Sequence, residues 1–265
     1  MFAENPRINM QIDSMAQRHQ YILDRLRQEG YIRVADLCTE LNVSAVTIRK
    51  DLKVLSDKNM LFRSHGSISL QNPYTADRDV KEKGNILVDE KGRIGQFAAS
   101  LLVPGEAIII ASGTTVLKLA EAIPTDMQLT VLTSAMNVCM ALIEKPNLEI
   151  VQLGGIVRKS SVSAIGAFAE DQLAQFSCTK LFMGVDGIDL DQGCTTSNMM
   201  EAQLNRAMMR AVQDTIVLAD SSKFGKRSFG KICPLSEVNH IITDHGIGTN
   251  ISQSIENQGV ELTLV

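Results

Sequence analysis

The chain has 265 residues, 45% of them apolar and 21% charged, which is enough for one large globular domain or two smaller ones. The formal net charge of −4 excludes a protein that is basic throughout, so any binding to nucleic acid must be a local property. The longest aliphatic runs, such as residues 107–111, are far too short to cross a bilayer, and the N-terminus lacks the basic-then-apolar pattern of a secretory signal.

Cysteine usage argues against disulfides and metal clusters. The five cysteines are scattered, odd in number and never arranged as C-x-x-C: Cys38, Cys139, Cys178, Cys194 and Cys233. Histidine, the other common ligand of transition metals, occurs only four times. We therefore expect reduced thiols in a cytoplasmic protein, with neither a metal nor a cofactor.

Charge and composition divide the chain into two parts. Residues 1–70 hold ten Lys and Arg against eight Asp and Glu, a balance of +2, so the remainder carries −6. The stretch that follows residue 70 is polar and contains residues that break regular structure, which is typical of a linker. We predict a flexible tail over 1–14, a small domain over 15–70, a linker over 71–85 and a larger domain over 86–265.

Helical patterns come first in the small domain. A helix is predicted from about residue 14 to residue 29, with Ile22, Leu23 and Leu26 on its apolar face. Residues 32–34 could form a short strand, and a second helix is predicted near residues 34–41.

A third helix is predicted after a turn and cap supplied by residues 42–44. At about 100° per residue, Ile48, Leu52 and Leu55 fall on one side of this helix, and its three cations fall roughly opposite. Three cations on a helix are often no more than a solvated face. After two preceding helices and a tight turn, however, they are typical of a helix-turn-helix, whose last helix enters the major groove of DNA.

Residues 60–70 alternate around Gly66 and predict a two-stranded wing, which completes a winged helix-turn-helix domain over 15–70. Its cations would contact phosphates, and an exposed first-turn residue such as Val46 would meet base edges or a thymine methyl. The predicted DNA-binding residues are Ser44, Ala45, Val46, Thr47, Arg49, Lys50, Lys53, Arg63 and His65.

Seven short apolar runs alternate with helical patterns after residue 85, at residues 107–111, 129–133, 148–153, 180–185, 214–220, 240–244 and 260–265. This alternation predicts an α/β domain with a mostly parallel sheet. Residues 193–198 are predicted as a loop in which Thr195, Thr196 and Asn198 could contact a ligand. Residues 201–212 are predicted as a helix, from which Glu201 or Arg206 could line the ligand pocket. The methionines around this helix favour packing rather than a site.

The segment Ser112-Gly113-Thr114-Thr115 ends an apolar strand and opens a helix. Ligands of parallel sheets bind at the carboxyl ends of the strands, and the free amides of a helix N-terminus favour a phosphate. A plain Ser/Thr cap is the alternative for this segment taken by itself.

Polar residues follow other strands in the same way. Asp186 is suited to accept hydrogen bonds from sugar hydroxyls, and Arg158 and Lys223 could hold a phosphate. Tight turns and surface cations are the alternatives. The predicted ligand-binding residues are Ser112, Gly113, Thr114, Thr115, Thr133, Ser134, Gly154, Gly155, Arg158, Asp186, Thr195, Glu201, Asp220 and Lys223.

Residues 34–68, VADLCTELNVSAVTIRKDLKVLSDKNMLFRSHGSI, resemble the DeoR family of bacterial transcription regulators, whose pattern includes T-I-R-R-D-L and R-x-H-G-G-A. Lys50 stands for the second Arg of the first motif, and Ser67-Ile68 replace Gly-Ala at the wing. Residues 112–115, 153–166, 182–189 and 218–229 resemble the second domain of the same family, so the resemblance extends over nearly the whole chain.

The resemblance implies a C-terminal fold similar to ribose-5-phosphate isomerase and coenzyme-A transferases, and a phosphorylated sugar as effector. It also implies double-stranded operator DNA as a partner, repression of a carbohydrate operon, and a homo-oligomer, either a dimer or a tetramer. Residues 133–138 and 189–208 look most similar to the N-acetylgalactosamine and galactitol branch. Ala111 replaces a common Asp, and Ser134-Ala135 replace Asn-Ser, which predicts a change in the sugar hydroxyls that are read.

An isomerase is the rival hypothesis, because enzymes of the related fold share such binding loops. Those enzymes carry Asp-Gly-Ala-Asp-Glu and a Lys-Gly-Gly-Gly run, whereas Met183 and Gly187 stand at the outer carboxylate positions here and no such run follows. Proton transfer beside a carbonyl needs a positioned base and a cation. We therefore predict binding without turnover. An RNA-binding winged helix is disfavoured because no aromatic stacking surface is evident.

Overall fold

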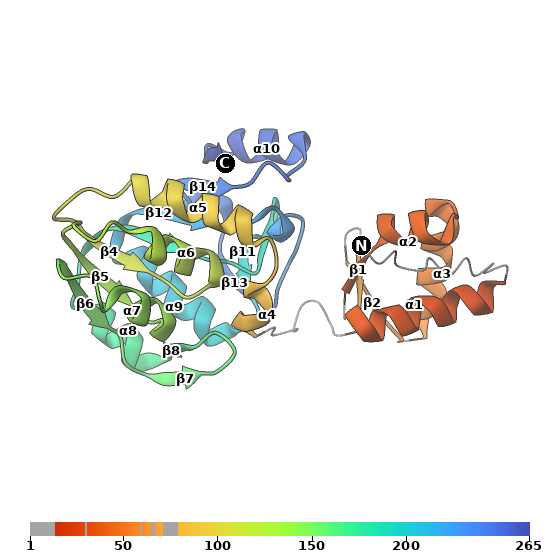
Figure 1. Ribbon diagram of the computed structural model, residues 1–265, viewed down its shortest axis with the longest axis horizontal. Helices are drawn as coiled ribbons and strands as arrows, with labels where there is room; N and C mark the ends of the chain where they lie inside the picture. Colours follow the sequence, from red (N-terminus) through yellow and green to blue (C-terminus); the bar gives the residue numbers. More distant parts are fainter. Residues whose placement is uncertain (1–13, 30, 59, 65–66, 71–78) are drawn as a thin grey trace, which may run out of the picture. The chain divides into compact units, whose positions relative to one another are not determined.

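Two units of unequal size make up the fold in a computed structural model that describes residues 14–29, 31–58, 60–64, 67–70 and 79–265 (Figure 1). They are Met1–Pro73 and Tyr74–Val265. Most of the predicted tail and residues 71–78 of the predicted linker lie outside the described residues.

The smaller unit contains three helices and a small sheet. The elements are α1 (Met15–Glu29), β1 (Tyr31–Arg33), α2 (Val34–Leu41), α3 (Ala45–Asp57), β2 (Phe62–Ser64) and β3 (Ser67–Ser69). The strands pair antiparallel in the order β1-β3-β2. The predicted two-stranded wing, β2 and β3, is therefore extended by a third strand, β1, which lies between α1 and α2 in the sequence.

The predicted apolar faces of the first and third helices form one core. Ile22, Leu23 and Leu26 of α1 are buried with Ile48 and Leu52 of α3, and α2 and the small sheet contribute the rest of the cluster. The amphipathic period of these helices thus predicted their buried sides correctly.

The turn between α2 and α3 is made by residues suited to it. Asn42 has a left-handed backbone, with φ 50° and ψ 44°, a conformation that asparagine tolerates better than most residues. Ser44 then caps α3, because its Oγ accepts a hydrogen bond from the Thr47 amide at 3.2 Å. This local chemistry explains why α2 ends and α3 begins where the sequence predicts.

The larger unit is built on a seven-stranded parallel sheet in the order β15-β14-β12-β9-β4-β5-β6. The strands are β4 (Ala107–Ile110), β5 (Leu129–Thr133), β6 (Leu148–Gln152), β9 (Cys178–Met183), β12 (Val212–Leu218), β14 (His240–Thr243) and β15 (Glu261–Leu264). Each of the seven predicted apolar runs is one of these strands, which confirms the α/β prediction.

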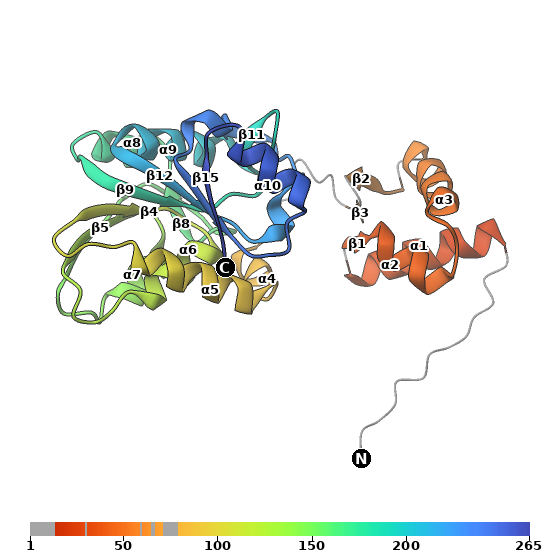
Figure 2. The same ribbon diagram turned by 90° about the horizontal axis from the view of Figure 1, so that it is seen from above.

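Helices cover both faces of this sheet (Figure 2). One face packs against α5 (Val88–Ser100), α6 (Thr114–Ala122) and α7 (Met136–Leu142), and the other against α8 (Ala167–Leu173), α9 (Met199–Arg210) and α10 (Thr249–Glu256). Successive residues of a strand point to opposite faces, so Ile108 and Ile110 join the first layer and Ile109 the second. Both faces are therefore apolar, as the near-continuous aliphatic strands require.

Short antiparallel pieces stand beside the main sheet. They are β7 (Ile156–Arg158), β8 (Ser163–Ile165), β10 (Gly187–Asp189), β11 (Gly193–Thr196) and β13 (Gly230–Cys233), with the 3₁₀ turns η1 (Ser221–Lys223) and η2 (Leu235–Glu237). The prediction of a loop over 193–198 is therefore wrong for residues 193–196, which pair with a strand nearly forty residues later.

The helix predicted over 201–212 begins and ends two residues earlier. Asn198 caps it by accepting hydrogen bonds from the Met200 and Glu201 amides at 3.0 and 3.1 Å, and residue 212 already belongs to β12. Met208 is buried as predicted, but Met199 is 45% exposed, so the packing role expected for the methionines holds for only part of them.

The predicted linker also needs a correction. Within it, Val80–Gly84 form the short helix α4, capped by the Asp79 side chain, which accepts a hydrogen bond from the Lys81 amide at 2.8 Å. A five-residue helix with no buried side chain leaves no apolar period to detect, which is why its sequence suggests a linker. None of the helices in the described ranges has the length and apolar character that a bilayer crossing needs.

Candidate functional site

The exposed side of α3 carries the residues predicted to read DNA. Arg49, Lys50 and Lys53 are exposed, and none of them forms a hydrogen bond or ion pair with another residue in the described part of the chain. Val46 is 60% exposed in the first turn of the same helix, beside the exposed Ala45. The helix thus presents free cations and an apolar contact on one surface, as the sequence predicted.

The other predicted DNA-binding residues take different positions. Ser44 and Thr47 form the α3 cap, with 3.0 Å between their hydroxyl oxygens, so they fix the helix start. Arg63 is exposed on β2. His65 lies outside the described residues.

A buried carboxylate ties α3 to α1. Asp51 is 3% exposed and accepts hydrogen bonds from Arg18, at 2.8 Å from Nε and 3.3 Å from Nη2. His19 Nε2 lies 3.2 Å from the same carboxylate. This contact has no signal in the sequence, because an acid beside three cations on a helix gives no sign of which partner it meets. The contact sets how the exposed face of α3 is presented.

In the larger unit a pocket opens at the carboxyl ends of three adjacent strands. The turn after β4 supplies residues 112–115, the turn after β9 supplies 184–186, and η1 after β12 supplies Lys223. The cavity measures about 40 Å³. Its lining residues are Val80, Lys83, Ser112, Gly113, Thr114, Thr115, Arg158, Ser160, Ser161, Gly184, Val185, Asp186, Thr196, Glu201, Leu218 and Lys223.

The turn at the start of α6 is shaped by glycine. Gly113 has φ 144°, in the range that glycine favours, and a methyl group added there would lie 3.7 Å from Cα of Gly184 in the neighbouring turn. The first amides of α6 have no partner within the helix. Because this end also carries the positive pole of the helix dipole, it is a suitable place for an anion.

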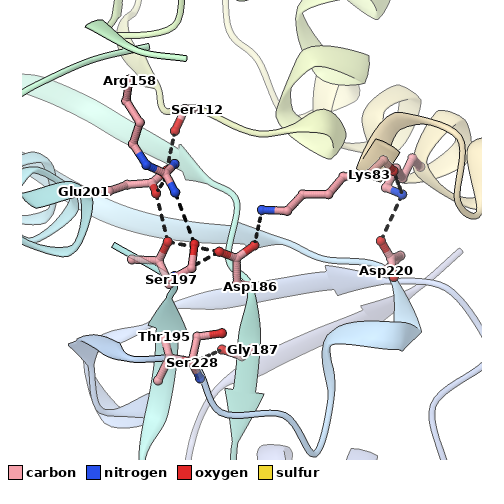
Figure 3. A network of polar contacts seen from close by, with 12 residues as sticks. Lys83, Ser112, Arg158, Asp186, Gly187, Thr195, Ser197, Glu201, Asp220 and Ser228 are labelled. Atoms are coloured by element: carbon pink, nitrogen blue, oxygen red, sulfur yellow. Dashed lines mark hydrogen bonds and ion pairs between the residues drawn. The ribbon is translucent and has the colours of Figure 1, made fainter. Parts of the chain in front are cut away.

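Asp186 is the centre of the polar network in the pocket (Figure 3). Its carboxylate accepts hydrogen bonds from Lys83 Nζ at 2.7 Å, the Ser197 amide at 3.0 Å and Thr196 Oγ1 at 3.2 Å. Burial by itself would raise the pKa of Asp186, but the ammonium groups of Lys83 and Lys223, together with these hydrogen bonds, hold that pKa well below its usual range. The group is therefore a carboxylate at neutral pH.

Glu201 forms a second buried cluster beside the first (Figure 3). One carboxylate oxygen accepts from Ser112 Oγ at 2.8 Å, and the other accepts from Arg158 Nη1 at 2.9 Å. Thr196 Oγ1 lies 3.0 Å from this second oxygen and shares its single hydrogen between Glu201 and Asp186. Arg158 also donates to Ser197 Oγ at 3.2 Å. The Arg158 guanidinium thus faces the pocket from β7 while being held by a carboxylate.

Lys223 differs from the other cations of the pocket. Its ammonium group makes no hydrogen bond or ion pair with any residue in the described ranges. Burial lowers the pKa of Lys223, and the carboxylates of Asp220 and Asp186 oppose that decrease. A partly buried ammonium without a direct partner favours an anionic ligand, because the ligand would replace the lost solvation.

Eight of the fourteen predicted ligand-binding residues line this pocket: Ser112, Gly113, Thr114, Thr115, Arg158, Asp186, Glu201 and Lys223. The other six do not, and each is used within the fold. Thr133 is buried and accepts a hydrogen bond from the Ala135 amide at 3.1 Å, and the Ser134 carbonyl accepts one from Ala164 at 2.8 Å.

The two glycines after β6 are structural. The Gly154 amide donates to the Gln172 side chain at 2.8 Å. Gly155 has φ 148°, and a methyl group added there would lie 2.6 Å from the carbonyl oxygen of Ile165, which has no room to yield. The close backbone approach expected at this pair is therefore made by β8 rather than by a ligand.

Thr195 and Asp220 point elsewhere. Thr195 Oγ1 donates to the Gly187 carbonyl at 3.1 Å and accepts from the Ser228 amide at 3.0 Å. Asp220 caps η1 and lies 3.3 Å from the buried ammonium group of Lys91. Thr196, not Thr195, faces the pocket, because alternate residues of β11 point to opposite sides.

Several pocket residues were not predicted. Ser160 lies two residues from a predicted position. Thr196, by contrast, was predicted together with Thr195 and Asn198, and of these three it is the one that lines the pocket. Lys83 belongs to the segment that resembled a linker and carries no local signal. Among the described residues, no group of three His, Cys, Asp or Glu side chains is arranged to hold a metal ion.

Comparison with known proteins gives consistent matches in both units. Residues 18–73 match a family model described as a DeoR-like helix-turn-helix domain, and residues 87–245 match one described as a DeoR C terminal sensor domain. A putative aga operon transcriptional repressor of Escherichia coli O157:H7 is 35% identical over 96% of this chain and 95% of its own length.

Two further similarities complete the comparison. The HTH-type transcriptional regulator YulB of Bacillus subtilis is 34% identical over 95% of this chain and 97% of its own length. Among solved structures, ribose 5-phosphate isomerase A of Neisseria gonorrhoeae overlaps 51% of this chain and 53% of its own, with 16% identity and a TM-score of 0.38.

Proposed function

Because this chain belongs to the DeoR family of transcriptional regulators, we propose that it binds operator DNA through α3 and a phosphorylated sugar through the pocket of its sensor domain. One observation carries the ligand assignment: the Lys223 ammonium group lacks a direct partner in a pocket that also contains the start of α6. Repression of a carbohydrate operon is the regulatory outcome.

The DNA assignment is supported by the exposed face of α3. Arg49, Lys50 and Lys53 lack acidic partners in the described part of the chain, so they are available to backbone phosphates without breaking other contacts. Since the whole chain carries a net charge of −4, this local cationic face is where DNA association would occur.

The sugar-phosphate assignment combines two kinds of polar group. The amides at the start of α6 and the Lys223 ammonium group suit a phosphate. The carboxylates of Asp186 and Glu201 suit sugar hydroxyls, which need acceptors. The similarity to an aga operon repressor and to the N-acetylgalactosamine branch favours a phosphorylated amino sugar over other classes.

Binding without turnover is the part of the proposal that separates a sensor from an isomerase. A general base works best with a pKa near the working pH, but Asp186 is held far below that range and accepts hydrogen bonds on both oxygens. Glu201 is likewise engaged by Arg158 and Ser112. Conversion of pentose or hexose phosphates by the purified protein above background would refute this part.

We also propose a homo-oligomer, a dimer or a tetramer, because operators that are read by helix-turn-helix proteins present paired half-sites. Light scattering of the purified chain tests this directly. A monomer at the concentrations at which it binds DNA specifically would contradict it.

The central experiment is a thermal-shift screen with phosphorylated sugars, followed by operator titrations. A ligand that binds only the folded state raises its stability in proportion to ligand excess over Kd. An inducing ligand must also weaken DNA binding, since coupling between two sites is reciprocal. Stabilisation by free sugars but not by their phosphates would count against the phosphate site.

Arg49→Ala is expected to weaken binding to all DNA sequences by roughly tenfold to a hundredfold, because a charged hydrogen bond to phosphate is lost. The slope of log K against log salt should fall in magnitude by about 0.9, the value for one released counterion. Fluorescence anisotropy at several salt concentrations measures both. The control is Arg27→Ala, which removes an exposed arginine from α1 and should leave the slope unchanged.

Val46→Ala is expected to alter sequence preference more than overall affinity. Its exposed methyl groups can pack on a thymine methyl, and one base contact contributes about 1–3 kcal/mol of discrimination. Selection of duplexes from a random library by both proteins compares the preferences. An equal loss on every sequence would remove Val46 from the base-reading residues.

A further inference from the structure

The short helix α4 covers one side of the pocket. Val80 and Lys83 are both lining residues, and the Val80 amide donates to the Ser160 carbonyl at 2.7 Å in the loop between β7 and β8. At the other end of α4, a methyl group added at Gly84 would lie 3.9 Å from Cγ2 of Thr114, in the first turn of α6. The helix α4 therefore extends from the β7–β8 loop on one wall of the pocket to the start of α6, the turn suited to a phosphate, on the other wall.

The two ends of α4 are held very differently. The buried ammonium group of Lys91 on α5 donates to the carbonyls of Lys83 and Ile86 and lies 3.3 Å from the Asp220 carboxylate. This contact anchors the C-terminal end of α4 to the end of β12. The N-terminal end, which follows the DNA-binding domain in the chain, has the Val80–Ser160 hydrogen bond. The Lys83 side chain, one turn further along the helix, forms the ion pair with Asp186.

The cavity is too small for the proposed ligand as it stands. It measures about 40 Å³, whereas sites for small organic ligands usually measure roughly 300–1,000 Å³. Part of the wall must move to admit a sugar phosphate. The sheet and the start of α6 are fixed by the main core, but α4 has no buried side chain, so its displacement exposes the least apolar surface.

The charges near Lys83 indicate what would displace α4. In this structure the Lys83 ammonium is paired with Asp186, which also lies near Lys223. A phosphate bound beside Lys223 would bring up to two negative charges next to the same pair and would compete with the carboxylate for Lys83.

We propose that Lys83 is the residue that couples the sensor pocket to the DNA-binding domain: a phosphorylated ligand draws its ammonium group from Asp186, and the N-terminal end of α4 leaves the β7–β8 loop. The inference rests on the proposed function, since it takes the same pocket as the ligand site. The inference adds a residue with two roles. Lys83 would contact the ligand and would also control the position of the chain segment that leads to the DNA-binding domain.

The proposal separates binding from response. Lys223 lies on η1, which follows β12 directly and is capped by Asp220, and within the described ranges no contact links it to α4 in the way that Lys83 is linked, so its role is affinity for the ligand. Lys83 contributes to affinity for the ligand and also to coupling. Coupling is measured as the ratio of the operator Kd with saturating ligand to the operator Kd without ligand. A residue with only a binding role loses its effect once the ligand is saturating, whereas a coupling residue does not.

The test compares the wild-type chain with Lys83→Met and Lys81→Met. Lys81 is exposed on the same helix, so its substitution removes the same charge without touching the pocket. The probes are inorganic phosphate and galactosamine 6-phosphate, each titrated to saturation by calorimetry. Operator binding is measured by anisotropy on a duplex selected by the wild-type chain, and hydrogen exchange is followed in peptides spanning residues 79–87.

In the wild-type and Lys81→Met chains, a saturating probe should weaken operator binding by about 5- to 150-fold, the usual range of allosteric coupling. Exchange at the Val80 amide should rise at the same time. Lys83→Met should still bind the probe, but saturation should change its operator Kd by less than about twofold and leave exchange in α4 unchanged. Lys83→Arg, which keeps a cation, should restore most of the response.

The two possible failures can be told apart. If neither probe binds the wild-type chain, the phosphate site itself is refuted and the inference with it. If the wild-type chain binds and responds, and Lys83→Met at saturation responds by the same factor, the coupling role of Lys83 is refuted while the site stands. Circular dichroism and thermal melting verify that the variants are folded, and the Lys83→Arg rescue decides the case if Lys83→Met is destabilised.

Discussion

Replacing Lys223 with methionine is expected to abolish the effector response at ordinary ligand concentrations while leaving operator affinity unchanged. The ammonium group is the pocket cation without a direct partner in the described ranges, so a bound phosphate would supply its main interaction. A hydrogen bond between charged groups contributes about 1.5–3 kcal/mol, so ligand Kd should rise roughly 10- to 150-fold. Methionine keeps the length of the side chain and limits the loss of packing.

The control for this substitution is Lys231→Met. Lys231 is an exposed residue of β13 in the same domain, so the change in net charge is identical and the pocket is untouched. Calorimetry gives the ligand Kd, and anisotropy gives the operator Kd with and without ligand. An unchanged ligand Kd in Lys223→Met would exclude Lys223 from the site.

The pH dependence of ligand binding provides a second measurement on the same variant. Burial lowers the pKa of Lys223, against the opposing effect of Asp220 and Asp186, so its proton is lost at a lower pH than in an exposed lysine. Only the ammonium form attracts phosphate. Affinity of the wild-type chain should therefore decrease as pH rises from neutral toward the ordinary lysine range, and Lys223→Met should lack this decrease.

Replacing Asp51 with asparagine is expected to destabilise the DNA-binding domain selectively. The substitution leaves the Arg18 guanidinium, whose side chain is 14% exposed, without its counter-charge against α3. Removing one partner of a fully buried pair costs about 3–5 kcal/mol. Since water still reaches part of Arg18, a loss of about 2 kcal/mol is the better expectation. For so small a domain this corresponds to a decrease in Tm of roughly 10 °C.

Hydrogen exchange on the full chain locates this effect. Amides of α1 and α3 should lose protection in Asp51→Asn, while those of the seven-stranded sheet should not. Asp57→Asn, at the exposed end of the same helix, is the matched control and should behave as wild type. Loss of DNA binding with full protection in α3 would instead show that Asp51 acts on DNA directly, despite its burial.

Local sequence patterns predicted most of the architecture. The seven apolar runs became the seven strands of one parallel sheet, because a strand buried on both faces must be aliphatic along its length. The stripe of Ile48, Leu52 and Leu55 gave the buried side of α3, and with it the exposed cationic side. These features depend only on residues close together in sequence.

The predictions that missed the site involved contacts between distant parts of the chain. Residues 193–196 form β11 because β10 and β13 flank them, and that pairing decides that Thr196 rather than Thr195 faces the pocket. Gly155 meets β8 and Asp220 meets Lys91, so neither reaches the ligand space. No local period distinguishes these outcomes from the predicted ones.

The sequence by itself determined the seven strands of the main sheet, the three helices of the DNA-binding domain and the sides they bury, and that polar turns follow the strands. Only the tertiary structure decided which of those turns meet, because the strand order β15-β14-β12-β9-β4-β5-β6 brings the turns after β4, β9 and β12 to one place. It also decided that Lys83 reaches Asp186, 103 residues further along the chain, at 2.7 Å. Periodicity in the sequence indicates which face of a helix or strand a residue occupies. Only the packing of distant elements brings an ammonium group to its carboxylate.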